Sequence, residues 1–296
     1  MIDKLEMFLA VAKEGHFGRA AVSLGITQPT LSTGIKQLEE QLGVQLIFRG
    51  SRYGGLTPEG QTALTWARKI VGDTRQLRDE MRFKRRGLSG KLRIAVIPTA
   101  LTWAAKLSSR FGEKHPNVSF TILSRTSNEV LSMLDNLDVD AGISYLDNEP
   151  MGRVTTQPLY EERYMLVCAE GSALAGRDSV GWNELADQRL CLLTPDMQNR
   201  RIINKRFLDA GVTPETIVES NSAIVLVANV EAGGFVTVLP EDMARFLIDG
   251  KNLSVVPLDG HEPAHLVGLV APYREPHTPV LDVLLREARY LSSVSR

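Results

Sequence analysis

The stretch ITQPTLSTGIKQLEEQLG, residues 26–43, decides the fold of the N-terminal region. Its apolar residues recur with the period of one helical face: Leu31, Ile35, Leu38 and Leu42. Thr27 is a good N-cap for such a helix, and Pro29 falls in a first turn, where amide hydrogens lack intrahelical partners anyway. The stretch therefore predicts a helix that begins near residue 28 and buries one stripe.

The polar face of this helix carries short hydrogen-bonding side chains instead of the lysines and glutamates of a purely solvated surface. Hydroxyl and amide groups can contact base edges and phosphates in a DNA major groove. The helical pattern at residues 19–24 and the turn at Gly25 complete a helix-turn-helix. We therefore expect these residues to contact double-stranded DNA: Arg19, Thr27, Gln28, Pro29, Thr30, Ser32, Thr33 and Lys36.

Gly34 is the residue of this helix that its helical propensity does not explain. Glycine inside a helix costs about 1 kcal/mol relative to alanine. Gly34 lies beside the buried stripe, so close helix packing or close approach to DNA could each account for it.

A short hairpin is predicted after the helix, between residues 43 and 57, with Arg49 and Arg52 near its tip. A hairpin in this position is typical of a winged helix-turn-helix, whose wing contacts the phosphate backbone or the minor groove. The two arginines are therefore further candidates for DNA contact, with a solvated turn as the alternative.

A long helix is predicted over residues 58–87, beginning after the N-cap Thr57. A heptad-like seam runs along it: Ala63, Ala67, Ile70, Thr74, Leu77 and Met81. Such a seam favours pairing with a second copy of the helix, and a helix of a monomeric bundle is the alternative.

The composition is that of an ordinary globular protein of two or three domains. The 296 residues are 43% apolar with a net charge of −1, but residues 1–91 carry +6 and the remainder −7. This asymmetry fits a basic end that faces nucleic acid and a separate domain. We find neither the pattern of a signal peptide nor an apolar run long enough to span a membrane, and expect a cytoplasmic protein. Cys168 and Cys191 are expected to be buried thiols, with a redox switch as the alternative.

Beyond a hinge at residues 88–91, short apolar runs alternate with helical patterns of 10–15 residues. This alternation predicts an α/β region with mostly parallel sheets, long enough for two lobes. Ligands of such sheets bind at the carboxyl ends of strands, near helix N-termini. Candidate ligand contacts at those positions are Pro98, Thr99, Ser127, Asn128, Thr194, Gln198, Asn221 and Ser222. Arg200 and Arg201 could add charge for a carboxylate, or form solvated salt bridges.

Catalytic signatures are missing from the sequence: it contains no GxSxG, HExxH, GxxxxGK[ST] or strand-linked GxGxxG motif. His261 and His265 have the spacing of helical metal ligands but lie in a loop-like HEPAH segment. We therefore expect no enzyme, no metal site, no catalytic residues and no cofactor.

The N-terminal residues resemble the LysR-type transcriptional regulators. The matching positions have the spacing of that family: Phe8, Ala12, Phe17, Ala20, Ala21, Leu24, Gln28, Pro29, Leu31, Ser32, Ile35, Leu38, Glu39, Leu42, Gly43, Leu46, Arg49, Leu56, Thr57 and Gly60. The resemblance continues through LRIAVIPT, DAGI at residues 140–143 and AGGFVTVLP at 232–240. It implies a winged helix-turn-helix, a dimerising linker helix and a two-lobed effector domain of the periplasmic-binding-protein type, often in a tetramer.

Some positions depart from the family pattern. Ile47 replaces a usual phenylalanine, Leu137 replaces a frequent glycine, and Thr33 with Gly34 replaces a pair that is often larger and more basic. Phe235 stands at the second glycine of the family's AGxGI pattern, so the resemblance predicts an aromatic ring in the effector cleft, unless the register differs by one residue.

The resulting fold class is a multidomain protein with α+β and α/β parts. The predicted domains are a winged helix-turn-helix (1–60), a linker helix (58–87), a hinge (88–91) and an effector domain (92–296), with lobe I at about 92–161 and 268–296 and lobe II at about 162–267. We expect a sequence-specific regulator controlled by a small polar or anionic metabolite, working as a dimer or dimer of dimers, with RNA polymerase as a further partner. The alternatives are a solute-binding protein and an architectural DNA binder without an effector.

Overall fold

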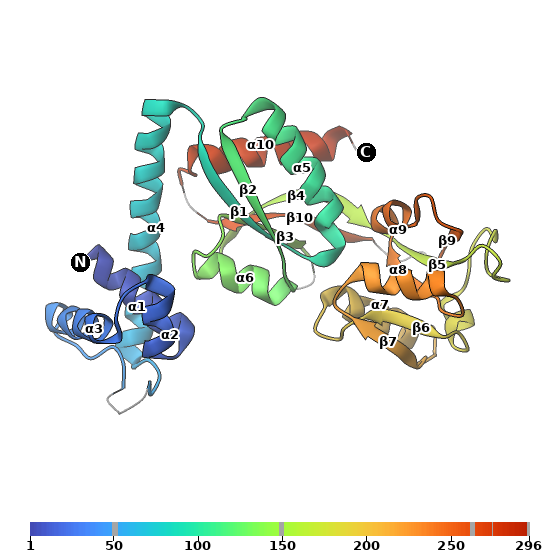
Figure 1. Cartoon of the computed structure of the whole chain (residues 1–296), viewed down its shortest axis with the longest axis horizontal. Coiled ribbons are helices and arrows are strands. Elements are labelled where there is room, and N and C mark those ends of the chain that lie inside the picture. Colours follow the sequence, from blue (N-terminus) through green and yellow to red (C-terminus); the bar gives the residue numbers. More distant parts are fainter. Residues whose placement is uncertain (49–52, 148–150, 261–263, 274, 295–296) are drawn as a thin grey trace. The chain divides into compact units, whose positions relative to one another are not determined.

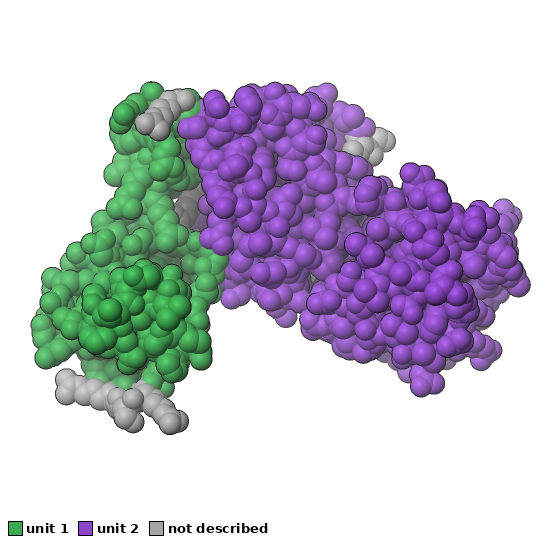
Figure 2. Space-filling model, viewed as in Figure 1, with its two compact units in different colours: residues 1–87, 135–138, 276–279 green, residues 88–134, 139–275, 280–296 purple. Residues whose placement is uncertain are grey.

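The computed structural model describes residues 1–48, 53–147, 151–260, 264–273 and 275–294 (Figure 1). The chain divides into two compact units, which Figure 2 colours separately. Unit 1 comprises residues 1–87, 135–138 and 276–279, and unit 2 comprises residues 88–134, 139–275 and 280–296. Among the described residues, no helix combines the length and apolar character that crossing a membrane requires.

Unit 1 is a helical unit with a small apolar core. Its first three helices are α1 (Ile2–Glu14), α2 (Phe17–Leu24) and α3 (Gln28–Leu42). Left-handed glycines end all three of them: Gly15, Gly25 and Gly43. The apolar stripe of α3 packs into a core with Phe8 and Val11 of α1. Leu42, predicted within that stripe, is instead exposed, because α3 ends there.

Two sequence features of α3 find their physical reason in this core. The hydroxyl of Thr27 accepts a hydrogen bond from the amide of Thr30 at 3.4 Å, so Thr27 is the N-cap and α3 begins where predicted. Gly34 is buried, and a Cβ at this position would overlap the sulfur of Met7 on α1. Close packing of α3 on α1 therefore explains the glycine.

The stem of the predicted wing is present after α3. Ile47 bridges Leu56, and one carboxylate oxygen of Glu39 accepts from the amides of Leu46 (2.8 Å) and Ile47 (3.2 Å). Glu39 thereby fixes the base of the wing to α3. The tip, with Arg49 and Arg52, lies outside the described residues.

Helix α4 (Pro58–Arg86) follows, capped by Thr57, whose hydroxyl accepts from the amide of Gly60 at 2.9 Å. The structure divides the predicted seam into two parts. Ala67 is fully buried and Ala63 partly buried in the core of unit 1, because this half of α4 packs on α1. Ile70, Leu77 and Met81 of the predicted seam are exposed, and with the exposed Trp66 they form one line, which we call the α4 stripe. Phe83, also exposed, lies off this line.

Unit 2 contains two lobes. Lobe I has a five-stranded sheet in the order β2-β1-β3-β10-β4. Its strands are β1 (Gly90–Val96), β2 (Val118–Ser124), β3 (Ala141–Tyr145), β4 (Val154–Glu162) and β10 (His265–Pro272). Its helices are α5 (Leu101–Lys114), preceded by a 3-10 turn (Pro98–Ala100), α6 (Ser127–Asp135) and α10 (Pro279–Val294).

Lobe II is built from a three-stranded sheet, β8-β5-β9, and a two-stranded sheet, β6-β7. The two sheets adjoin through a bridge between Leu190 and Val236. The strands are β5 (Tyr164–Ala169), β6 (Leu190–Leu193), β7 (Thr216–Ser220), β8 (Thr237–Pro240) and β9 (Leu253–Pro257). The helices are α7 (Gln198–Asp209), α8 (Ala223–Ala232) and α9 (Glu241–Ile248), together with a 3-10 turn (Trp182–Leu185).

The prediction of mostly parallel sheets was wrong. β1 pairs in parallel with β2 and β3, and β6 with β7, but β10 runs antiparallel to β3 and β4, and β5 runs antiparallel to β8 and β9. The antiparallel strands arise because the chain crosses from lobe I to lobe II directly, from β4 into β5, and returns through β10. A direct crossing requires no helical crossover and so does not impose parallel pairing.

Candidate DNA interface and effector cavity

The N-terminal half of α3 presents a polar surface on a buried support. Leu31, Ile35 and Leu38 are buried, whereas the side chains predicted to meet DNA are exposed: Thr27, Gln28, Pro29, Thr30, Ser32, Thr33 and Lys36. Lys36 lies 3.9 Å from Glu40, one turn along the same face. The arrangement offers hydroxyl, amide and ammonium groups on one rigid helix, which is what base edges and phosphates require.

Arg19 lies on the neighbouring helix α2 and is exposed, with its guanidinium bonded to the carbonyl oxygen of Glu14 at 2.5 Å. The start of α2 was not anticipated from the sequence. His16 is its N-cap, and its Nδ1 accepts from the amides of Gly18 (3.0 Å) and Arg19 (3.3 Å). Histidine is not among the favoured N-cap residues, so propensity alone gave no signal for this role.

A cavity of about 880 Å³ lies between the two lobes of unit 2. Lobe I contributes residues from the start of α5 and from the segment that joins β2 to α6: Pro98, Leu101, Thr102, Ala105, Lys106, Ser124, Arg125, Thr126 and Glu129. Lobe II contributes Asp196, Met197, Asn221, Ser222, Ala223, Ile224, Met243, Phe246 and Leu247. The volume suits a small organic molecule.

Several side-chain polar atoms of unit 2 are buried without a hydrogen-bond partner among the described residues. They include the hydroxyls of Thr102 and Thr194 and both amide atoms of Asn199. Thr102 lines the cavity itself. Buried polar groups in folded proteins normally have partners, so hydroxyl and amide groups left without one indicate a place for a ligand or for water.

The structure separates the predicted effector residues into two groups. Pro98, Asn221 and Ser222 line the cavity, and Thr99 and Ser127 are buried close to the strand ends of lobe I. Two others are directed elsewhere: Asn128 is exposed on α6, and the amide oxygen of Gln198 accepts from Nε of Arg201 at 2.7 Å.

Phe235 differs from its prediction, because it does not line the cavity. Its ring packs on the edge of the lobe II core, and the guanidinium of Arg189 lies over the ring at 4.3 Å. The preceding glycines, Gly233 (φ 102°) and Gly234 (φ 76°), make a turn that directs the ring toward Arg189.

Arg200 of α7 has a structural role. Arg200 is buried, and its Nη1 donates to a carboxylate oxygen of Glu219 (2.9 Å) and to the carbonyl oxygen of Leu193 (2.8 Å). Its remaining donors reach Thr216 (3.0 Å) and Asn204 (2.9 Å). This network ties α7 to β6 and β7, so Arg200 is not available to a ligand carboxylate.

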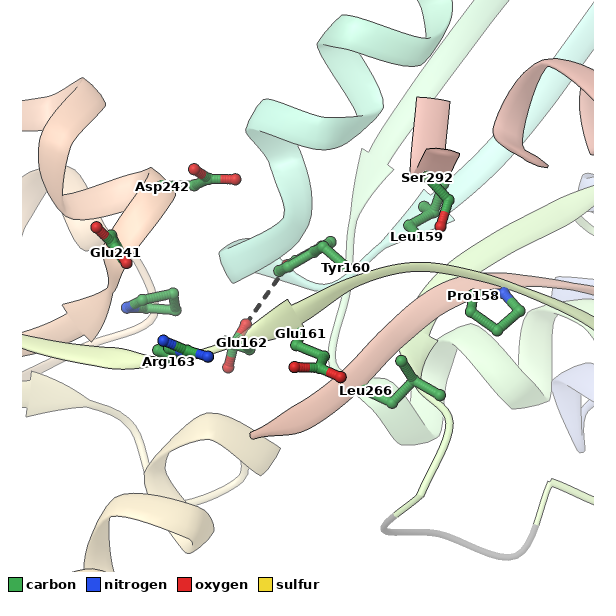
Figure 3. Close-up of a pocket in the computed structure, with 11 residues that line it drawn as sticks. Pro158, Leu159, Tyr160, Glu161, Glu162, Arg163, Glu241, Asp242, Leu266 and Ser292 are labelled. Carbon is green, nitrogen blue, oxygen red and sulfur yellow. Dashed lines mark hydrogen bonds between the residues drawn. The ribbon is translucent and has the colours of Figure 1, made fainter. Parts of the chain in front are cut away.

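A second cavity, of about 470 Å³, lies where β4 crosses into lobe II (Figure 3). The buried Glu162 is its central group. One carboxylate oxygen accepts from the hydroxyls of Tyr145 (2.5 Å) and Tyr164 (2.7 Å), and the other from Tyr160 (3.4 Å). Burial raises the pKa of Glu162, while the phenol hydrogen bonds act in the opposite direction. Glu162 therefore joins the end of β3 to the start of β5.

Both cysteines are fully buried and free, Cys168 on β5 and Cys191 on β6. Burial raises the pKa of both thiols, that of Cys191 to about 11. A reactive thiol requires an exposed site and a lowered pKa. The prediction of inert buried thiols fits this environment, and the redox alternative does not.

No cluster of three potential metal ligands occurs within the part of the chain that the structure describes. His261 lies outside that part. Nδ1 of His265 lies 3.5 Å from a carboxylate oxygen of Asp147, and burial lowers the pKa of this imidazole.

Three residues that line the 880 Å³ cavity have no clear signal in the sequence: Met197, Met243 and Phe246. Met197 and Met243 are apolar residues of the kind expected in a core, and both are buried. Phe246 is largely exposed although it is aromatic. The only sequence signal for them was indirect: Met197 lies between two predicted contacts, Thr194 and Gln198.

Comparisons with known proteins agree with this architecture. Residues 2–61 match the family described as "Bacterial regulatory helix-turn-helix protein, lysR family", and residues 85–291 match "LysR substrate binding domain". The chain is 29% identical over 242 residues to the HTH-type transcriptional regulator XapR of Escherichia coli K12, covering 81% of this chain and 82% of that protein. It is 30% identical over 285 residues to a probable hydrogen peroxide-inducible genes activator of Mycobacterium avium, covering 91% and 87%.

A solved structure is similar over almost its full length. Full-length OxyR of Pseudomonas aeruginosa, solved as a point variant, has a TM-score of 0.74 and 25% identity, with 98% of this chain and 97% of that chain covered. The relatives named here are regulators of transcription and none is named as an enzyme. The helix-turn-helix unit, the two-lobed unit and both family matches lead to one conclusion: this chain belongs to the LysR family of DNA-binding transcriptional regulators.

Proposed function

We propose that this regulator binds a specific double-stranded DNA site as a dimer, through the exposed polar face of α3, and that a small molecule between the lobes of unit 2 controls this binding. The observation that carries the DNA part is the exposed row of polar groups on α3 above a fully buried stripe. Each copy places one α3 in a major groove, and two copies read two half-sites.

The test of DNA recognition is selection of binding sites from a random DNA library, followed by titration of the selected site and a scrambled site at several salt concentrations. We expect a two-fold symmetric site and an affinity at least a thousandfold above that for scrambled DNA. Equal affinity for both DNAs at every salt concentration would contradict sequence-specific regulation and favour an architectural binder.

We propose that the effector is a small polar or anionic molecule bound in the 880 Å³ cavity. Two observations support it. The N-terminus of α8 opens on the cavity, where the N-cap Ser222 makes no side-chain bond to the helix, and backbone amides there favour a negative or carbonyl group. The unpartnered hydroxyl of Thr102 supplies a hydrogen-bonding group on the opposite wall.

The effector is sought by thermal unfolding of the full chain against a panel of small organic acids and other metabolites. A ligand at 100 times its dissociation constant adds about 2.7 kcal/mol to the stability of the unit that binds it. The same compound must change the affinity for the selected DNA, since coupling between two sites is reciprocal. A compound that stabilises the protein without altering DNA binding would contradict its role as effector.

The environment of the two thiols argues against control by thiol oxidation, which the name of one relative suggests. The M. avium relative is named as a probable activator of hydrogen peroxide-inducible genes, but both cysteines of this chain are buried with raised pKa values. We therefore propose control by ligand binding and not by thiol oxidation.

The proposal has three further parts: the protein assembles through the α4 stripe, acts in the cytoplasm and contacts RNA polymerase. Transport of a solute gains no support from the relatives named above.

A further inference from the structure

We propose that a hydrogen bond between Trp103 and Asp242 is an inter-lobe latch that positions α5 against α9 and so sets the width of the effector cavity. The use of this cavity by an effector is part of the proposed function, and the inference rests on it to that extent. The latch itself rests on the contacts of these two side chains.

The two residues come from different lobes. The indole Nε1 of Trp103, on α5 of lobe I, donates to a carboxylate oxygen of Asp242, on α9 of lobe II, at 2.6 Å. The ammonium of Lys106 lies 3.6 Å from the same oxygen and 4.6 Å from the indole ring centroid. Asp242 therefore receives both a hydrogen bond and a positive charge from one face of α5.

Trp103 is held rigidly. Only 3% of its surface is exposed, and its ring stacks on Tyr160 with centroids 4.6 Å apart and planes 5° from parallel. Tyr160 belongs to β4 and donates to Glu162, the group at the strand crossing. Because the indole is fixed by stacking, its N–H presents one direction to Asp242. The hydrogen bond can then set the position of α9.

The latch lies between the effector cavity and the cavity at the strand crossing. Thr102, Ala105 and Lys106 of α5 line the effector cavity, as do Met243, Phe246 and Leu247 of α9. Asp242 and Tyr160 line the cavity at the crossing, and Figure 3 shows Asp242 directed from the start of α9 toward the ribbon of α5, with Tyr160 beneath that helix. A change in the spacing of α5 and α9 would move two opposite walls of the effector cavity together.

The first test measures the distance between the lobes in the full-length protein. Nitroxide labels are placed by Glu113→Cys on α5 and Ala228→Cys on α8, both exposed, while the native cysteines are buried and stay unlabelled. Labelled subunits are diluted with unlabelled ones to suppress distances between copies. Electron–electron distance measurements then compare wild type with latch variants.

The variants separate positioning from folding. Trp103→Phe keeps the stacked ring and removes the donor, Asp242→Leu removes the acceptor, and Asp242→Asn keeps an acceptor oxygen. The matched controls are Trp182→Phe, at an indole in lobe II, and Glu241→Gln, next to Asp242 but paired with Arg245. We expect a broader or longer inter-lobe distance for Trp103→Phe and Asp242→Leu, and the wild-type distribution for Asp242→Asn and both controls. Asp242 is partly exposed, so Asp242→Leu remains informative if Trp103→Phe folds poorly.

The second test uses ligand size, which a purely structural role would not change. Benzoate, 2-naphthoate and 2-anthroate are titrated against each variant by thermal shift. The latch predicts that Trp103→Phe and Asp242→Leu change the ratio of affinities for the large and small acids by about tenfold, as expected for loss of a hydrogen bond to a charged group, and that the controls do not.

Wild-type distances in both Trp103→Phe and Asp242→Leu, with unfolding midpoints near that of the wild type, would overturn the latch. An unchanged affinity ratio in acids that do bind would overturn its control of cavity width. If no acid binds the wild type, the result counts against the proposed effector site, and the distances alone decide the latch.

Discussion

The polar face of α3 and the polar groups of the inter-lobe cleft are built from similar residues but differ in their surroundings. On α3 the hydroxyl and amide side chains are exposed and supported from below by Leu31, Ile35 and Leu38. In the cleft the hydroxyl of Thr102 is buried without a hydrogen-bond partner among the described residues. The same holds for the hydroxyl of Thr194 and the amide of Asn199, which come before and after the lining residues Asp196 and Met197 in the chain. The first surface is exposed to water when it is free, and the second has buried polar groups for which the described part of the protein supplies no partner.

These surroundings determine how each surface can bind a partner. The polar groups of a hydrated face are satisfied in the free protein, so binding DNA exchanges their water for bases and phosphates without first destabilising the protein. A buried group without a partner destabilises the empty protein, so a small ligand that satisfies it gains affinity from a defect already present. The predictions below test whether the two surfaces respond in these opposite ways.

The largest expected effect comes from the support of the DNA-binding face. In Gly60→Ala the new Cβ would overlap the backbone carbonyl oxygen of Leu46, which cannot move without disturbing the wing. We expect a loss of about 3 kcal/mol in the stability of unit 1, measured by chemical denaturation.

Gly34→Ala is the matched control, since the atom it would meet is the flexible end of Met7. It should change stability by less than about 1 kcal/mol, because better helix propensity offsets the contact. Equal losses in the two variants would contradict the distinction between rigid and flexible neighbours.

The second effect concerns the exposed polar face itself. Gln28→Ala should leave stability unchanged and relax the preference at one base pair by about 1–3 kcal/mol. Lys36→Ala should weaken binding to selected and scrambled DNA alike and lower the slope of log affinity against log salt concentration by about one. Titrations on single-base variants of the selected site decide between them, and identical behaviour of the two variants would remove the assigned roles.

The third prediction compares two threonines, one from each surface. Thr27→Val removes the cap of α3 and should destabilise unit 1 by about 1 kcal/mol. Thr102→Val removes a buried hydroxyl without a partner and should stabilise the empty unit 2 by about 1 kcal/mol, while weakening effector binding. Thermal unfolding without ligand checks the signs, and a loss in both variants would show that the Thr102 hydroxyl is already satisfied.

The fourth prediction is a pH dependence at Glu162. Burial raises the pKa of this carboxyl, so the folded state holds the proton more tightly than the unfolded state does. Its contribution to stability is complete below the unfolded pKa and is lost as the pH rises through the folded pKa. Glu162→Gln should therefore reduce the fall in melting temperature of unit 2 between pH 5 and pH 8 by roughly 2 °C or more.

Glu161→Gln, at the exposed neighbouring residue, is the control for this measurement and should melt like the wild type at both pH values. If Glu162→Gln melts with the same pH dependence as the wild type, the carboxyl does not titrate in this range.

The smallest expected effect is at the thiols. Neither Cys168 nor Cys191 should react with a thiol reagent in the native protein at pH 8, because both are buried with raised pKa values. Hydrogen peroxide should leave DNA affinity unchanged. Two thiols should become reactive in denaturant, and rapid labelling of the native chain would reopen control by oxidation.

The DNA-binding end could be predicted from the sequence because its determinants are local. The N-cap at Thr27, the buried stripe and the terminating Gly43 of α3 all depend on residues within a few positions of each other. The exceptions have nonlocal causes. Ala67 was assigned to a dimer seam, but its partner is α1, more than 50 residues earlier in the chain.

The cleft was predictable in outline but not in detail. Helix starts after strands pointed to Pro98, Asn221 and Ser222, since topology brings strand ends together. The orientation of a side chain at such an end depends on its neighbours in space. Arg201 turns Gln198 aside and Arg189 attracts the ring of Phe235, and neither contact follows from the pattern of apolar residues.

The burial of Ala67 in unit 1 has a mechanical consequence. The first half of α4 packs in the same core as α3, so the α4 stripe and the exposed polar face of α3 belong to one rigid unit. In a dimer paired through the α4 stripe, as proposed above, the place of pairing along α4 sets the distance between the two α3 helices. Inserting seven residues after Thr74 would keep the stripe on one face and displace its outer part by about 10 Å. Inserting two residues instead would rotate Leu77 and Met81 by about 200°, to the opposite side of the helix, because each added residue turns the helix by about 100°.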